Sequence, residues 1–237
     1  YETNISDFQL VSYILGRCAT VDEVKAEIAR VHIHGFDPRS STVHWRFAEP
    51  SGRQIVLEII DGKCVFYENK LGVLTNSPSF DWQLTNLNNY VNLLPGRTEP
   101  HTLGNMSLSS FGGGSAMIGL PGDFTPPSRF VRAAFFQSTA PQKPDAEGSV
   151  FTAFHILGSM EIPIGAQFPV DETPADIPSA TQCTCVTDMS GLRFYYRSMY
   201  DGGIRCIDLK EIDFKKIGLK SEPLVPSKKE FVHHIRF

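Results

Sequence analysis

The stretch GVLTNSPSFDW, residues 72 to 82, marks the point where the chain changes from a strand-like to a helix-like pattern. Residues 71 to 75 form an apolar run that predicts a strand, and Ser77-Pro78 is typical of a turn. Residues 80 to 94 remain open between helix and coil, because an asparagine-rich face alternates with apolar positions. Asn76 therefore stands in the turn between these two segments.

The chain before this junction predicts two helices and then an antiparallel meander. Apolar spacing predicts a helix over residues 5 to 16, and the capping-box pair Thr20 and Glu23 predicts a second, whose apolar stripe runs to Val31. Gly35 to Ser41 then interrupt the pattern, and Asp61-Gly62 is a two-residue hairpin signal. The strands expected here are residues 42 to 47, 54 to 60 and 63 to 67, with 71 to 75 as the fourth.

The chain after the junction predicts a long connection, two more helices and a second meander. Residues 95 to 126 lack a regular pattern, and so long a loop usually serves function or assembly. The tail from Ser221 is polar and basic and is expected to be a strand or a strap. Helices are expected at residues 128 to 137 and 149 to 160, and strands at 181 to 187, 192 to 198 and 204 to 209.

The order helices, sheet, helices, sheet predicts an α+β fold. Two antiparallel sheets with helices outside would form a four-layer αββα sandwich. Because no internal repeat and no clean linker divides the chain, residues 1–237 are expected to form one domain.

Composition argues against two classes of partner. The chain carries 22 Lys and Arg against 26 Asp and Glu, a formal charge of −4, so no nucleic acid is expected as a partner. Apolar runs such as Ile55 to Ile60 fall far short of the roughly 18 residues that span a bilayer, so no membrane partner is expected either.

The five cysteines are expected to be mostly buried, reduced thiols. Cys183 and Cys185 are two apart, hence on one face of a strand, with Cys206 expected one strand away. Core thiols are favoured over a zinc site, which needs four ligands, and neither a metal nor an organic cofactor is predicted. Reduced thiols favour the cytoplasm over the periplasm, although the compartment stays open. His44 is expected to be a partnered core histidine rather than a base.

A second long motif, residues 119 to 132 with the sequence GLPGDFTPPSRFVR, joins the first in pointing to a family. Together they closely resemble the choloylglycine hydrolase family, which contains conjugated bile salt hydrolases and penicillin V acylases, and the resemblance extends along nearly the whole chain. It implies an N-terminal-nucleophile hydrolase with an αββα sandwich. Such enzymes cleave linear amide C–N bonds in small molecules through a cysteine exposed as the first residue, whose α-amine can act as its base.

The resemblance also implies two site residues. Asn76 matches the family's asparagine beside the nucleophile, whose amide would orient the amine or the oxyanion; the alternative is an asparagine that serves only the turn before Pro78. Arg129 matches the family's active-site arginine, which would favour the thiolate. The alternative is a surface arginine, and Arg132 is a competitor for the same role.

The family's nucleophilic cysteine has no counterpart among the residues of this chain, which starts with Tyr1. The expectation is therefore an incomplete sandwich that needs its missing N-terminal segment as a partner and is inactive alone. Bile salt deconjugation is the leading function, with penicillin V or acyl-homoserine lactone acylation as alternatives and a non-catalytic binding scaffold as a further one. Residues 88 to 120 resemble the assembly loop of tetrameric members, so a homotetramer or dimer is expected.

Overall fold

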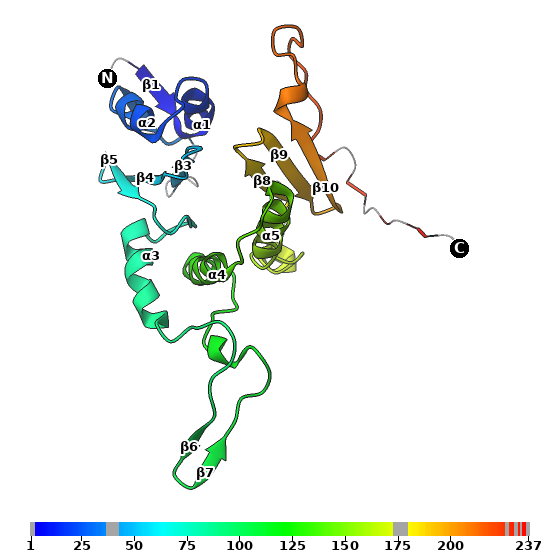
Figure 1. Ribbon diagram of the computed structural model, residues 1–237. Helices are drawn as coiled ribbons and strands as arrows, with labels where there is room; N and C mark the ends of the chain where they lie inside the picture. The colour runs from blue at the N-terminus through cyan, green and yellow to red at the C-terminus, as the bar shows by residue number, and fades with distance from the viewer. Residues whose placement is uncertain are drawn as a thin grey trace. The chain divides into compact units, whose positions relative to one another are not determined.

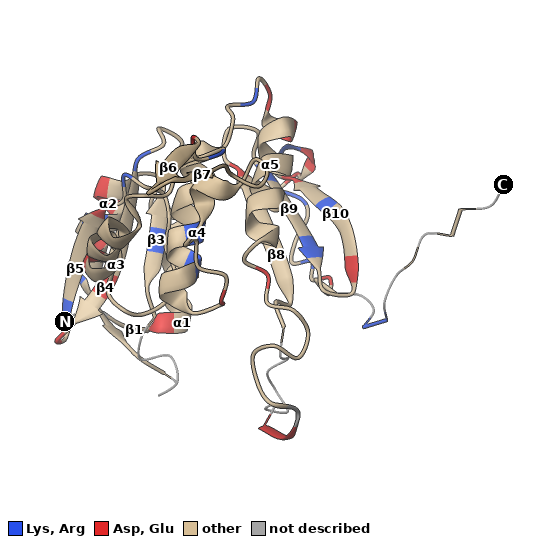
Figure 2. Cartoon of the chain, turned by 90° about the horizontal axis from the view of Figure 1, so that it is seen from below, with Lys and Arg blue, Asp and Glu red and all other residues tan. Residues whose placement is uncertain are grey.

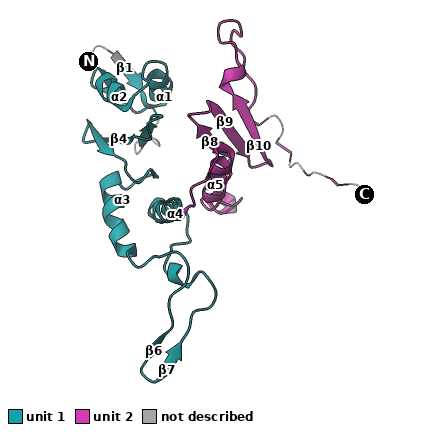
Figure 3. Cartoon of the chain, in the orientation of Figure 1, with its two compact units in different colours: residues 1–139 teal, residues 140–237 magenta. Residues whose placement is uncertain are grey.

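The computed structural model describes residues 3–36, 43–172, 180–225, 228–229, 232 and 234–235. It comprises two compact units, residues 1–139 and 140–237 (Figure 3). Tyr1, residues 37 to 41 of the predicted interruption, Thr42 of the first predicted strand and parts of the tail lie outside the described residues.

Unit 1 begins with strand β1 (Thr3–Ser6), helices α1 (Asp7–Leu15) and α2 (Val21–Ile28), and strand β2 (Val31–His34). The capping box at Thr20 and Glu23 is present, which confirms the predicted start of α2. The prediction that the helical stripe runs to Val31 is wrong. Val31 and Ile33 are buried, alternate with less buried positions and pair in parallel with Thr3 and Ile5, so β1 offers these β-branched residues a strand partner.

Strands β3 (Trp45–Ala48), β4 (Gln54–Ile60) and β5 (Lys63–Glu68) form the antiparallel meander predicted for the first half of the chain (Figure 1). Asp61 and Gly62 both have positive φ, at 49° and 74°, as a two-residue turn between twisted strands requires. The order is β3-β4-β5, with β4 at the centre.

The central strand β4 is buried on both faces. Ile55 and Leu57 pack into a cluster with residues of α1 and α2, such as Leu10 and Val24. Val56 packs on the other side with Phe80 and Phe130. Each fully buried side chain of this size contributes about 1.5–3 kcal/mol relative to exposure, so these clusters fix the sheet between two layers.

The fourth strand predicted at residues 71 to 75 is absent, because side chains rather than a neighbouring strand satisfy its backbone. The Asn69 side chain accepts from the N–H of Gly72 and donates to the carbonyl of Val73, and Gln137 Nε2 donates to the carbonyl of Leu71. Gly72 has φ +73°, and a Cβ there would lie 2.5 Å from Gln137 Nε2. The positive φ therefore favours glycine at this position of the loop.

The rest of unit 1 resolves the two segments that the sequence leaves irregular. The ambiguous segment becomes helix α3 (Phe80–Asn86) and the 3₁₀ turn η2 (Leu87–Tyr90). The long connection contains the hairpin β6 (His101–Leu103) and β7 (Met106–Leu108), which extends from the body of the unit (Figure 1), and the turn η3 (Ser115–Met117). Helix α4 (Pro126–Thr139) closes the unit.

Unit 2 contains helix α5 (Ala146–Gly158) and an antiparallel sheet of order β10-β9-β8, as predicted for the second meander. Tyr195 packs with Val150 and Phe154 of α5. The tail beyond Ser221 has no strand among its described residues. The remaining bounds are η4 (Val170–Glu172), β8 (Cys183–Asp188), β9 (Arg193–Ser198), β10 (Asp201–Asp208) and η5 (Leu209–Glu211).

The prediction of buried cysteines is wrong for four of the five, since only Cys18 is partly buried. Cys183 and Cys185 do share a face of β8, but Cys206 lies on β10, beyond β9. Cys206 pairs with Tyr195, whereas Cys185 pairs with Tyr196, and successive strand residues point to opposite faces. The cysteines therefore do not gather on one surface.

Both units mix helices with antiparallel sheet, so the chain is α+β as predicted. The layer order αββα and the single domain concern the placement of the units and stay predictions. Basic and acidic positions are interspersed over both units (Figure 2). None of the helices in the described ranges is long and apolar enough to cross a membrane.

Candidate active site

The two predicted site residues meet. Arg129 Nη2 donates to Asn76 Oδ1 at 2.8 Å, although 53 positions separate them in the chain. Pro126 and Pro127 start α4, where the missing N–H of proline costs no helical hydrogen bond, and this places Arg129 in the first turn. The structure therefore joins the two long sequence motifs at one point.

Asn76 is held at two atoms. Its Oδ1 accepts from Arg129, and its backbone carbonyl accepts from Nε2 of Gln83, at 3.3 Å. Gln83 lies on α3 and is buried, whereas Asn76 itself is exposed. Because Oδ1 is occupied by the guanidinium, Nδ2 is the end of the amide that can donate to a ligand.

Arg129 is half-buried, and its Nε donates to the carbonyl of Phe124 at 2.9 Å. Burial, and then the positive charge of Arg132, lower the pKa of Arg129 from its ordinary value. A guanidinium nevertheless stays charged at all physiological pH values. Arg129 thus brings a fixed positive charge to the Asn76 amide.

Arg132 serves a different purpose from its competitor. It is 5% exposed, and its Nη1 donates to the carbonyls of Pro121 and Asp123 at 2.8 and 2.5 Å. These contacts direct the guanidinium into the loop before α4 and not toward Asn76. Arg132 therefore holds the loop whose neighbouring carbonyl, at Phe124, orients Arg129.

Asp123 completes the start of α4. Its Oδ1 accepts from the N–H of Thr125 at 2.9 Å, and its Oδ2 accepts from Ser128 Oγ at 2.7 Å. The hydrogen bonds from Thr125 and Ser128 lower the pKa of Asp123 to about 2. Sequence reasoning missed this residue, although an aspartate ahead of Pro-Pro is a helix-start signal.

A buried polar group lies directly beside Asn76. His44 Nδ1 lies 2.5 Å from Glu58 Oε1, and His44 Nε2 lies 3.5 Å from Ser77 Oγ. The side chains of His44 and Glu58 are 9% and 4% exposed, which confirms His44 as a buried, partnered histidine. Sequence reasoning missed Glu58, and the signal was available: a charged residue inside the apolar strand of residues 54 to 60.

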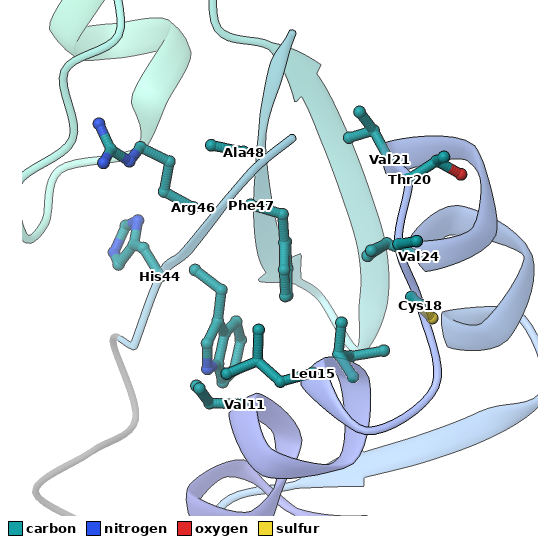
Figure 4. A pocket seen from close by; sticks show the side chains of 13 residues that line it. Val11, Leu15, Cys18, Thr20, Val21, Val24, His44, Arg46, Phe47 and Ala48 are labelled. Atoms are coloured by element: carbon teal, nitrogen blue, oxygen red, sulfur yellow. The ribbon is translucent and has the colours of Figure 1, made fainter. Parts of the chain in front are cut away.

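Two cavities flank strand β3. One of about 390 Å³ is lined in part by His44, Glu58, Ser77 and Ser79, and so reaches the neighbour of Asn76. The other, of about 440 Å³, is apolar and lies between β3 and the helices α1 and α2. In Figure 4 Phe47 points toward this second cavity, whereas His44 and Arg46 point away from it.

No group of three His, Cys, Asp or Glu side chains within the described ranges is arranged to hold a metal ion. The polar groups available at Asn76 are instead an amide, a guanidinium and a histidine–carboxylate pair. The amide and the guanidinium are suited to binding and stabilising an anion or a carbonyl oxygen.

Comparison with known proteins identifies the family of the chain. Residues 1–222 match the linear amide C-N hydrolases, choloylglycine hydrolase family. The chain belongs to this family. The bile salt hydrolase/transferase of Clostridium perfringens is 34% identical over 215 residues, which are 89% of this chain and 64% of that protein. The penicillin V acylase of Pectobacterium atrosepticum is 30% identical over 228 residues, 87% of this chain and 53% of that protein.

The fold agrees with the family. A crystal structure of a mutant conjugated bile acid hydrolase from Clostridium perfringens matches 99% of this chain and 70% of its own, with a TM-score of 0.83 and 31% identity. The chain is therefore an α+β protein of the N-terminal-nucleophile hydrolase type. It spans less than two thirds of the length of the two curated relatives above. The roles of Asn76 and Arg129 stay predictions.

Proposed function

We propose that this chain contributes Asn76 and Arg129 to a site that hydrolyses the amide bond of glycine- or taurine-conjugated bile salts. The observation that carries the proposal is the 2.8 Å hydrogen bond from Arg129 to Asn76 Oδ1, which unites the two family motifs. Bile salt hydrolases among the relatives support the substrate class.

The chemistry assigned to the site is acyl transfer through a cysteine. A thiolate attacks the amide carbonyl and forms a tetrahedral oxyanion, the amine leaves with a proton, and water then hydrolyses the thioester. Asn76 Nδ2 donates to the oxyanion or orients the α-amine, and the charge of Arg129 favours the thiolate. The nucleophile required is an N-terminal cysteine, and in this sequence none of the five cysteines carries a free α-amine.

The second candidate is penicillin V acylase activity, which the relative from Pectobacterium atrosepticum favours. The same residues would serve it, because both substrates present an amide carbonyl. What differs is the acyl group, a steroid in one case and a phenoxyacetyl group in the other. Apolar pockets discriminate between near neighbours by only ~1–3 kcal/mol per methylene, so the preference has to be measured.

The test is a comparison of kcat/KM for glycocholate and penicillin V, with protein expressed from its complete gene. The proposal predicts release of glycine from glycocholate with the higher kcat/KM. A higher value for penicillin V would reverse the assignment in favour of the acylase. Absence of turnover with both substrates would leave acyl-homoserine lactone acylation, which is assayed next, and then the binding scaffold.

We also propose that the protein assembles as a homotetramer or dimer through the connection that contains β6 and β7. Apolar side chains of this segment are largely exposed, among them Leu103 at 69%, Met106 at 65% and Phe111 at 99%. Exposed apolar groups on a projecting hairpin are typical of an assembly surface.

A further inference from the structure

The turn that carries Asn76 is fastened to the central strand of unit 1 by a buried carboxylate. Glu58 Oε1 accepts from the backbone N–H of Phe80 at 2.8 Å and lies 2.5 Å from His44 Nδ1. His44 in turn reaches Ser77 Oγ. Ser77 and Phe80 follow Asn76 by one and four residues. Glu58 and His44 therefore contact the turn directly after Asn76 and again at the start of α3.

The contacts define which atoms of the pair face each other. Glu58 Oε1 receives the N–H of Phe80, and an ionised carboxylate can only accept hydrogen bonds. His44 Nδ1 faces this oxygen, and Nε2 faces the Ser77 hydroxyl. The carboxylate fixes the orientation of the ring, and the ring fixes the hydroxyl.

Burying Glu58 and His44 costs free energy that apolar side chains at the same positions would not cost. Glu58 is 3% exposed inside an otherwise apolar run, and its Oε2 has no hydrogen-bond partner within the described residues. Apolar side chains of similar volume often stabilise such a position as well as a buried ion pair or better. A buried carboxyl group with one unpartnered oxygen is more readily explained by the groups that it orients than by a gain in stability.

The contact from Glu58 to Phe80 also extends toward Arg129. Phe80, whose N–H binds Glu58, packs against Phe130 with ring centroids 6.1 Å apart at 71°. Phe130 follows Arg129 on α4, and both phenylalanines are fully buried. A shift of Phe80 would therefore displace both partners of the Asn76–Arg129 hydrogen bond.

We propose that Glu58 and His44 are positioning residues for Asn76, which hold its turn so that the amide meets its ligand in a fixed orientation. This inference rests on the proposed function only for its effect on turnover. Neither side chain is proposed to touch the reacting atoms. The placement of Asn76 can be measured without substrate.

The test is Glu58→Gln, which keeps the side-chain volume and removes the charge. The matched control is Glu161→Gln in unit 2, where Glu161 Oε1 accepts from Arg197 Nη2 at 2.8 Å. The substrate-free readout is the NMR signal of the Asn76 side-chain amide in [¹⁵N]asparagine-labelled protein, assigned by its loss in Asn76→Asp. Glu58→Gln is expected to shift this signal and to lower kcat for glycocholate about 10–10²-fold, with KM changed less than about threefold.

The control is expected to leave both the signal and kcat in place. An unshifted Asn76 signal in folded Glu58→Gln protein overturns the inference, whatever the activity. Should Glu58→Gln not fold, Ser77→Ala, which removes only one hydroxyl, is judged by the same two readouts. If the wild-type protein turned over none of the substrates, the proposed function would be refuted. The NMR signal of the Asn76 amide would still decide the positioning role.

Discussion

At the scale of single residues, two arginines three positions apart on α4 have different binding partners. Arg129 points to Asn76, and Arg132 points to the carbonyls of the preceding loop. Their types and spacing are the same in either role, so the sequence alone leaves them as competitors. The difference arises from the path of residues 121 to 123, which places two carbonyl acceptors around Arg132.

Substitution by lysine separates these two roles. Arg129→Lys is expected to lower kcat ~10²-fold with little loss of stability, because a half-buried guanidinium is replaced by a charge that cannot reproduce its fork. Arg132→Lys is expected to reduce the free energy of unfolding by about 1–3 kcal/mol, because the part-buried hydrogen bonds to the carbonyls of Pro121 and Asp123 lose their guanidinium donor. Steady-state kinetics and urea unfolding of both variants measure this, and the reverse pattern would exchange their roles.

Asp123 predicts a pH-dependent contribution to stability. Its pKa of about 2 lies below the ordinary value, so its hydrogen bonds to Thr125 and Ser128 stabilise the fold fully at pH values above ~4. This contribution is lost as pH falls through about 2. The stability difference between wild type and Asp123→Asn should therefore be largest near neutral pH and shrink on acidification. A difference that stays constant from pH 7 to pH 2 in chemical unfolding would contradict it.

At the scale of elements, the segment from Asn69 to Thr75 shows how side chains can replace a strand partner. Arg46 Nη1 donates to the carbonyl of Gly72 at 2.8 Å, in addition to the contacts from Asn69 and Gln137. This loop delivers the chain from β5 to Asn76. Its shape depends on Gly72, which is buried and has positive φ.

Gly72→Ala is expected to be more destabilising than Gly52→Ala. Both glycines have positive φ, so both variants carry the backbone penalty of about 1–2 kcal/mol. Only at Gly72 does the new Cβ meet another group, Gln137 Nε2 at 2.5 Å, whereas nothing lies within 4 Å at Gly52. Thermal unfolding of the two variants measures the difference, and equal losses would show that Gln137 moves aside freely.

Most elements could be predicted from the sequence because local signals place them. The capping box of α2 and the Asp61-Gly62 turn of the β4–β5 hairpin depend on neighbours a few residues away. The failures at Val31 and at residues 71 to 75 depend on distant partners, β1 in one case and Gln137 in the other. The assignment of Asn76 and Arg129 to one site follows from family motifs. Glu58 is visible in the sequence as a charged residue in an apolar strand, whereas its contact with His44 depends on the sheet register.

At the scale of the whole molecule, assembly is the property that the β6–β7 connection is expected to control. Deleting residues 98 to 110 removes the hairpin without touching β3, β4 or β5, so the core of unit 1 should persist. Light scattering is expected to show a smaller particle than the wild type, with circular dichroism as the control for folding. An unchanged oligomer would place the assembly surface elsewhere.

The central claim is that Asn76 donates its amide to the reacting group of an amide hydrolase. The most direct test measures kcat for glycocholate with Asn76→Ala, in protein expressed from the complete gene, beside the control Asn88→Ala. Asn88 is an exposed asparagine whose Nδ2 donates to the nearby carbonyl of Thr85. A fall of ~10²–10³-fold for Asn76→Ala, with Asn88→Ala within twofold of wild type, is the predicted result. Wild-type kcat in folded Asn76→Ala protein would contradict it.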